Sequence, residues 1–260
     1  DRCRSTEGGR GRPNAGERER CLIEVDAGGN ELRSTRTGTA ATDRSHSVAE
    51  AASGNLSTTG YPQGELGGPN AGGSDVILSK FDANGSELWT TQIGTSNNDW
   101  GSAVAVDASG NAYVSGYTSD SQEHGFLSKF NSSGGLLWQS RIDTNAREYC
   151  WSVAVDAFGN AYVGGATYGD LGGPNAGGAE AYVRKFNSGG NVIWTSQIGT
   201  SSWDSVSSIA LGTTGDIYIS GTTSGDHGGD NAGDYDAYVG KLDSDGNVVW
   251  TTQFGTDKHD

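Results

Sequence analysis

The sequence predicts an all-β protein: a β-propeller built from four-stranded blades of about 50–56 residues, with about 4.5 repeats in the chain. One tryptophan-bearing element recurs at Trp89, Trp138, Trp194 and Trp250, and the spacings of 49, 56 and 56 residues fit a four-stranded blade better than a helical repeat. The composition agrees, because 43 glycines and 7 tryptophans beside 33% hydrophobic residues are typical of short strands and tight turns. Helical periodicity is absent from the sequence.

Each repeat is expected to contain four strands, a to d in chain order. In the second full unit, strand a covers 103–107, b covers 111–116, c covers 126–130 and d covers 136–141. Strand a is short and rich in Val and Ala, as expected where blades crowd around an axis. The tryptophan of strand d is expected to be buried in the wider gap between neighbouring blades. Turns of Asp, Asn and Gly join a to b and c to d as hairpins.

The chain is interpreted as a single propeller domain over residues 1–260, or a fragment of one. It divides into a degraded first repeat at 1–60 and further repeats at 61–116, 117–165, 166–221 and 222–260. Strands c and d are counted five times but a and b only four times, which predicts four complete blades and one half blade. The half blade around Leu22, Ile23 and Val25 is expected at an open edge or paired with another chain, because an unpaired strand edge invites partners.

The first repeat departs from the others. Arg33 stands where the later repeats have tryptophan, and Ser57-Thr58 stand where Tyr-Val would lie, so we expect Arg33 to be much more exposed than the tryptophans. Two interpretations stay open: a terminal blade with its own surface, as capping repeats have, or a repeat whose sequence has drifted or is partly misread.

Several short motifs resemble a known bacterial repeat. Val-Ala-Val-Asp at 104–107, Gly-Asn-Ala-Tyr-Val at 110–114 and Gly-Tyr-Thr at 116–118 are followed by a Lys-Phe strand and a Leu-Trp strand. This pattern is similar to the SBBP β-propeller repeat over nearly the whole chain. The resemblance implies a propeller from a secreted or cell-surface bacterial protein, and it implies no catalytic residue.

The charge and cysteine content exclude several classes of function. A formal net charge of −15 disfavours nucleic acid and anionic membranes as partners and favours solubility or cation binding. No apolar run is long enough to span a bilayer, and no stretch shows the pattern expected of a signal peptide. A Cys3–Cys21 bridge is compatible with an oxidising compartment, whereas Cys150 is expected to be unreactive.

An acid recurs in the connection from strand d to the next strand a, which predicts a negative ring at the channel mouth. With the aromatic residues beside it, this ring is a candidate site for a cation such as calcium, a sugar or a basic peptide. The alternative is that each acid accepts hydrogen bonds from backbone N–H groups of its own turn. The candidate residues are Asp43, Asp99, Trp100, Glu148, Tyr149, Trp203, Asp204 and Asp260.

Other candidate chemistry receives less support. The pairs Asp243/Asp245 and Asp82/Asn84 resemble the start of a calcium loop, but no bidentate Glu follows, and plain Asx turns explain them better. The Gly-rich loops between b and c precede a strand and lack Lys-Ser/Thr, so they do not predict a nucleotide site. The four histidines occupy different places in different repeats, and no nucleophile–histidine arrangement follows from their spacing.

The sequence therefore favours a non-catalytic extracellular binding or structural module for a protein, a glycan or a cation. Two alternatives stay open. The first is an enzyme or metalloprotein with its site at the channel mouth, since propellers host enzymes too. The second is a subunit of an extracellular assembly that self-associates through its incomplete blade.

Overall fold

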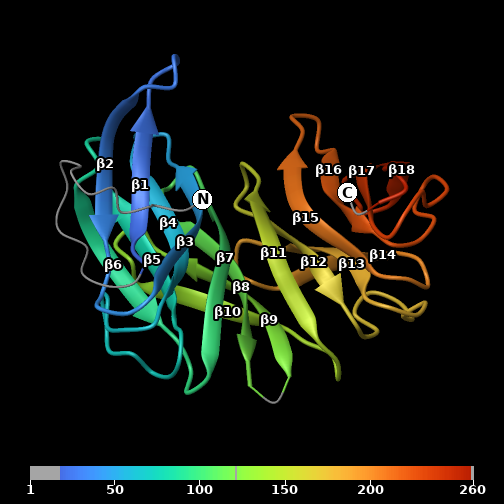
Figure 1. The fold of residues 1–260 in the computed structure, drawn as a ribbon, viewed down its shortest axis with the longest axis horizontal. Helices are drawn as coiled ribbons and strands as arrows, with labels where there is room; N and C mark the ends of the chain where they lie inside the picture. Colours follow the sequence, from blue (N-terminus) through green and yellow to red (C-terminus); the bar gives the residue numbers. More distant parts are fainter. Residues whose placement is uncertain (1–17, 121, 259–260) are drawn as a thin grey trace.

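The computed structural model describes residues 18–120 and 122–258. All regular secondary structure in these residues is β, and eighteen strands form four four-stranded sheets and one two-stranded sheet (Figure 1). The predicted all-β propeller class is therefore confirmed. The described residues contain no helix that could span a membrane.

The strands follow one another as antiparallel meanders, so each sheet is a continuous stretch of chain. The half blade consists of β1 (Arg20–Val25) and β2 (Glu31–Thr37). Blade 1 consists of β3 (Asp43–Glu50), β4 (Leu56–Pro62), β5 (Val76–Phe81) and β6 (Glu87–Ile93). Blade 2 consists of β7 (Asn98–Val106), β8 (Ala112–Ser119), β9 (Glu123–Phe130) and β10 (Leu136–Ile142). Blade 3 consists of β11 (Glu148–Val155), β12 (Ala161–Thr167), β13 (Glu180–Phe186) and β14 (Val192–Ile198). Blade 4 consists of β15 (Asp204–Leu211), β16 (Ile217–Thr223), β17 (Asp236–Leu242) and β18 (Val248–Phe254).

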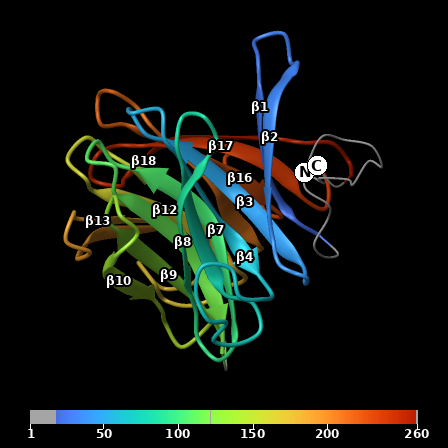
Figure 2. The same cartoon turned by 90° about the vertical axis from the view of Figure 1, so that its left-hand side faces the viewer.

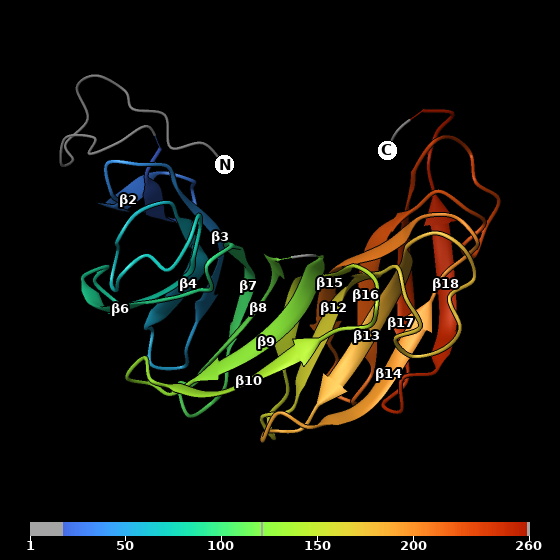
Figure 3. The same cartoon turned by 90° about the horizontal axis from the view of Figure 1, so that it is seen from below.

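The predicted count of four complete blades and one half blade is confirmed in the described residues. The blades stand side by side in an arc that leaves the first and last of them at opposite ends (Figure 3). The β1–β2 hairpin, which holds the c and d positions of its repeat, projects beyond the four-stranded sheets (Figure 2). Because each four-stranded sheet begins with strand a, the boundaries of these sheets lie about half a repeat away from the repeat boundaries read from the sequence.

The a strands begin earlier than the sequence predicts. In blade 2 strand a was expected from residue 103, but β7 begins at Asn98, and it contains a bulge between Gly101 and Ala103. The same bulge occurs in β3, β11 and β15. A bulge adds one residue and breaks the alternation of apolar and polar positions, which hides the first part of the strand from a period-two pattern.

The hydrophobic core lies between successive blades. Between blades 3 and 4, for example, Val183 and Ile198 of one sheet pack with Val206, Ile209 and Ile217 of the next. Equivalent clusters join blades 1 and 2 and blades 2 and 3. Full burial of such a side chain contributes about 1.5–3 kcal/mol, so the blades stabilise one another through these faces.

The d-strand tryptophans connect each blade to the next one. The ring N–H of Trp138 donates to the carbonyl oxygen of Ser188 at 3.1 Å, and the ring lies against Gly190, which has φ 86°. Trp89 and Trp194 make the same contacts with the following blades and are half-buried there. The expectation that all four rings are buried between blades is therefore met only in part: Trp89, Trp138 and Trp194 lie between blades but are half-buried. It is wrong for Trp250, which is 42% exposed because blade 4 is the last one described.

The half blade packs on blade 1 through polar contacts. Arg20 is buried, and its guanidinium donates to the hydroxyls of Ser45, Thr58 and Ser79. Burial lowers the pKa of Arg20 to about 10, against the opposing charges of Glu87 and Asp43. The other blades have valine or isoleucine at the position of Thr58. A threonine fits here because its hydroxyl accepts a hydrogen bond from the buried guanidinium of Arg20.

Candidate functional site

The repeated acids are buried in their own turns. Asp99 accepts from the backbone N–H of Thr95 at 2.7 Å and from the Thr95 hydroxyl at 2.9 Å. Asp43, Glu148 and Asp204 accept in the same way from the threonine four residues earlier. All four carboxylates are buried, and they lie in the a strands rather than in open loops. Asp260 lies outside the described residues.

Two of these acids accept further hydrogen bonds. Glu148 accepts from the hydroxyl of Thr167, and Asp204 accepts from the hydroxyl of Thr223. Burial raises the pKa of Asp43, and the hydrogen bonds from Thr39 and the charge of Arg20 oppose that shift. This geometry matches the alternative in which each acid caps its own turn. As turn caps, the four buried carboxylates accept hydrogen bonds within the protein.

The three aromatic residues beside the acids belong to a longer row. Successive ring centroids are 4.9–6.4 Å apart, and the rings come from all four blades. Tyr149 and Trp151 are stacked, with 9° between their planes, whereas most other neighbours meet edge to face. We call this set the aromatic row; it consists of His46, Tyr61, Trp100, Tyr117, Tyr149, Trp151, Trp203 and Tyr235.

The bulges of the a strands place part of this row. His46 and Trp151 are the extra residues in the bulges of β3 and β11, where no residue of the neighbouring strand lies opposite them. The bulge brings the two backbones close together at the facing glycine. A Cβ on Gly165 would lie 1.7 Å from the carbonyl oxygen of Tyr149, so only glycine fits. Gly60, Gly116 and Gly221 meet the same restriction in the other blades.

The aromatic row is largely neutral and partly open to solvent. Every ring except Tyr61 is half-buried or exposed. Burial raises the pKa of Tyr117 and of Tyr149, and it lowers the pKa of His46, so these groups carry no charge at neutral pH. Two cations approach the row: the guanidinium of Arg44 is 5.8 Å from the Tyr61 ring centroid, and the charge of Arg147, which pairs with Glu123, acts on Tyr149.

The sequence pattern predicted Trp100, Tyr149 and Trp203 but missed the rings between them. Tyr61 and Tyr117 occupy the same position of strand b, directly after the restricted glycine. This Gly-Tyr pair could have been found by aligning the b strands. Trp151 could not have been found in this way, because a period-two pattern that ignores the bulge assigns Trp151 to the face of the sheet opposite the row.

The predicted calcium turns are Asx turns in the structure. Asp243 accepts from the backbone N–H groups of Asp245 and Asn247, and the hydrogen bonds of Asn247 lower the pKa of Asp243. Asp82 accepts from Asn84 and Ser86 in the same way. Neither pair belongs to a group of three or more potential metal ligands in the part of the chain that the structure describes.

The described residues give no support for nucleophilic catalysis at cysteine. Cys150 is fully buried, and burial raises its pKa to about 12, so it stays a thiol. It packs between blades 2 and 3 and contacts the Tyr182 hydroxyl at 2.9 Å. The Cys3–Cys21 bridge that the sequence allows involves Cys3, which lies outside the described residues.

These blades define the chain as a β-propeller protein of the open-arc form seen here. The family model described as "Beta-propeller repeat" (SBBP) matches residues 88–121, which run from β6 to the end of β8. The resemblance read from the sequence is therefore confirmed at this repeat.

The chain is also similar to other proteins at low sequence identity, and it spans less than a fifth of the curated relative that it matches. A regulatory protein, FlaEY, of Caulobacter vibrioides is 24% identical over 202 residues, which cover 75% of this chain and 17% of that protein. A Bacteroides caccae protein of unknown function has a TM-score of 0.47 at 13% identity, covering 92% of this chain and 96% of that one. The periplasmic gluconolactonase of Pseudomonas aeruginosa has a TM-score of 0.43 at 11% identity, covering 91% of this chain and 78% of that one.

Proposed function

We propose that the chain is a non-catalytic binding module of a secreted or cell-surface bacterial protein, and that the aromatic row is its ligand-binding surface. The observation that carries this proposal is the continuity of eight rings across four blades. Three of the ring contacts also join neighbouring blades, but the buried inter-blade clusters consist of other residues, and most of the rings keep a face open to solvent. The bacterial surface location rests on the likeness to the SBBP repeat.

The ligand that fits this surface best is a neutral, extended glycan. Partly exposed aromatic rings offer flat apolar faces, and the hydroxyl and ring N–H groups at their edges offer hydrogen bonds. The neutral tyrosines and histidine leave the row without a strong charge, and the net charge of −15 repels polyanions. A long row suits a polymer that contacts several rings at once.

Calorimetric titration with neutral hexasaccharides of glucose, xylose and mannose tests this proposal. We expect saturable binding of at least one of them and a loss of about fivefold in affinity for Trp151→Ala, since one stacking contact contributes about 1 kcal/mol. Trp250→Ala is the matched control, because this ring is exposed but lies outside the row. The proposal fails if no sugar binds, if a protein partner binds through the row instead, or if both variants lose affinity equally.

A second candidate function is that of an assembly subunit, and the outward face of blade 4 favours it. Tyr218 and Phe254 are 40% and 54% exposed, whereas their counterparts in blade 3, Tyr162 and Ile198, are 4% and 8% exposed because blade 4 covers them. The uncovered face of blade 4 corresponds to the faces that blades 1, 2 and 3 each bury against the following blade. A second copy of this chain is the proposed occupant, since its half blade presents the exposed Ile23 and Val25.

Light scattering after gel filtration tests this assembly. We expect the wild type to self-associate at micromolar concentration and Phe254→Asp to be monomeric. Leu137→Asp is the matched control, because Leu137 is 52% exposed on the outer strand of blade 2. A monomeric wild type, or dissociation by both variants, contradicts the proposal.

A further inference from the structure

One corner of blade 2 is built differently from the same corner of the other blades. In blades 1 and 4, an acid at the start of strand c accepts from a glutamine of strand d, at 2.9 Å for both Asp75–Gln92 and Asp236–Gln253. Blade 3 has the same pair, Glu180 and Gln197. In blade 2, counting back from the shared lysine of strand c, His124 replaces the acid and Arg141 replaces the glutamine. Asp143 replaces the glycine that follows strand d elsewhere.

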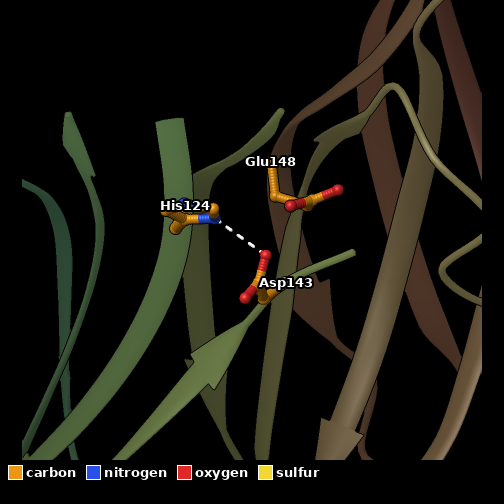
Figure 4. A group of neighbouring side chains, drawn as sticks. All are labelled: His124, Asp143 and Glu148. Carbon is orange, nitrogen blue, oxygen red and sulfur yellow. Dashed lines mark ion pairs between the residues drawn. The ribbon is translucent and has the colours of Figure 1, made fainter. Parts of the chain in front are cut away.

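These replacements leave one nitrogen of a buried histidine without a hydrogen bond. His124 is 6% exposed, and its Nε2 lies 3.0 Å from Asp120 Oδ1. Its Nδ1 lies 2.8 Å from Asp143 Oδ1, yet the direction of this contact is not that of a hydrogen bond, and Nδ1 is buried without a hydrogen-bonding partner. Figure 4 shows His124 and Asp143 facing each other with Glu148 beside them.

The three side chains converge from two blades. One ligand atom from each of His124, Asp143 and Glu148 lies within 4.8 Å of the others, and this is the one such group in the described residues. A tetrahedral zinc site with bonds of about 2.0–2.2 Å holds its ligand atoms roughly 3.3 Å apart, so small side-chain rotations suffice. Asp143, with its side chain 35% exposed, leaves a path for an ion from solvent.

The surrounding residues supply what a metal site needs beyond its ligands. Asp120 orients the imidazole through Nε2, as carboxylates do for metal-bound histidines. Donors from Thr144 and Thr167 hold the carboxylate of Glu148. Three carboxylates face two cations: Arg141, whose Nε lies 3.0 Å from Asp143 Oδ2, and Arg184, whose charge acts on Glu148. The local charge of about −1 that remains favours a bound cation.

We propose that His124 Nδ1, Asp143 and Glu148 form a binding site for a divalent transition-metal ion such as Zn²⁺. An imidazole ligand suits zinc, copper or nickel and not calcium, which prefers oxygen ligands only. The bound ion joins blade 2, through His124 and Asp143, to blade 3, through Glu148. It therefore stabilises the interface between these two blades, and a water molecule completes its coordination.

Calorimetric titration of the untagged, chelator-treated protein with Zn²⁺ and with Ca²⁺ tests the site. We expect one Zn²⁺ per chain, a melting temperature that rises with Zn²⁺ by mass action, and no response to Ca²⁺ at this site. Co²⁺ in place of Zn²⁺ should give a visible absorption band that reports nitrogen and oxygen ligands.

Matched variants separate binding at this site from binding elsewhere. His124→Gln and Asp143→Gly should each weaken Zn²⁺ binding by at least about tenfold. Asp143→Gly keeps the protein folded, because the other blades have glycine here. His227→Leu changes the other strongly buried histidine and should bind Zn²⁺ as the wild type does. No Zn²⁺ binding by the wild type, or equal binding by Asp143→Gly, overturns the proposal.

Discussion

The guanidinium of Arg33 donates a hydrogen bond to the carbonyl oxygen of Ala83, in the turn between β5 and β6. In the later blades the ring N–H of a tryptophan donates to the same turn position, as Trp89 does to Ser132. Arg33 also pairs with Glu24, and its side chain is 37% exposed. The expectation that Arg33 is much more exposed than the tryptophans is therefore wrong, because it takes over their contact.

We expect Arg33→Ala to lower the free energy of unfolding by about 1–2 kcal/mol, since it removes a charge-assisted hydrogen bond between the half blade and blade 1. Arg33→Trp should keep that contact and leave the free energy unchanged or raised. Denaturation by urea measures both variants. If Arg33→Ala leaves the free energy of unfolding unchanged, or if Arg33→Trp lowers it as much as Arg33→Ala does, Arg33 does not replace the turn contact of the tryptophans.

The tryptophans should differ in what they contribute. Trp138→Ala should cost about 3 kcal/mol, because it opens a cavity between blades 2 and 3. Trp250→Ala should cost about 1 kcal/mol or less, since no further blade of this chain covers the exposed ring. Thermal and urea unfolding of the two variants give the comparison. Equal costs would show that the outward face of blade 4 is covered in solution.

The acid of each a strand should stabilise its own turn. Asp99→Ala leaves the backbone N–H of Thr95 without its acceptor, and we expect a cost of about 1–3 kcal/mol. Exchange of the Thr95 amide hydrogen should become faster in this variant. A second experiment tests the competing hypothesis of a calcium ring. On that hypothesis, millimolar calcium raises the melting temperature of the wild type. It does not raise the melting temperature of the triple variant in which asparagine replaces Asp99, Glu148 and Asp204.

The architecture could be predicted because the repeat itself encodes it. Trp89, Trp138, Trp194 and Trp250 mark strand d of the four complete blades, and the Asp/Asn-Gly turns mark the hairpins, so the number of complete blades follows from counting. The polar packing of Arg20 on Thr58 and Ser79 could not be predicted, since it depends on three residues from different strands meeting in one interface.

The candidate sites were only partly visible in the sequence. The repeated acids are visible in the sequence, but whether they face solvent or their own backbone depends on the start of strand a, which the bulge conceals. The histidines occupy different places in the repeats, so their spacing alone indicates no site. Alignment of the c strands on their lysines would have shown His124 where the other blades have an acid.

Acidification should destabilise the protein through His227. This side chain is 6% exposed, its Nε2 is buried without a hydrogen-bonding partner, and its ring centroid lies 4.4 Å from that of Tyr238. Burial lowers the pKa of His227 below its usual value, although the charge of Asp204, 3.8 Å away, opposes the shift. The unfolded chain therefore binds a proton more readily than the folded chain, and stability present above about pH 6.5 is lost as the pH falls.

His227→Leu should remove part of this loss, because Leu66 and Leu171 hold the same position in blades 1 and 3. In all three blades the backbone N–H at this position donates to a d-strand glutamine, so leucine keeps that contact. We expect melting temperatures between about pH 7 and 5 to fall less steeply for the variant than for the wild type. His46, whose pKa burial also lowers, accounts for part of the remaining slope. Parallel pH profiles of variant and wild type would show that His227 is protonated without cost in the folded state.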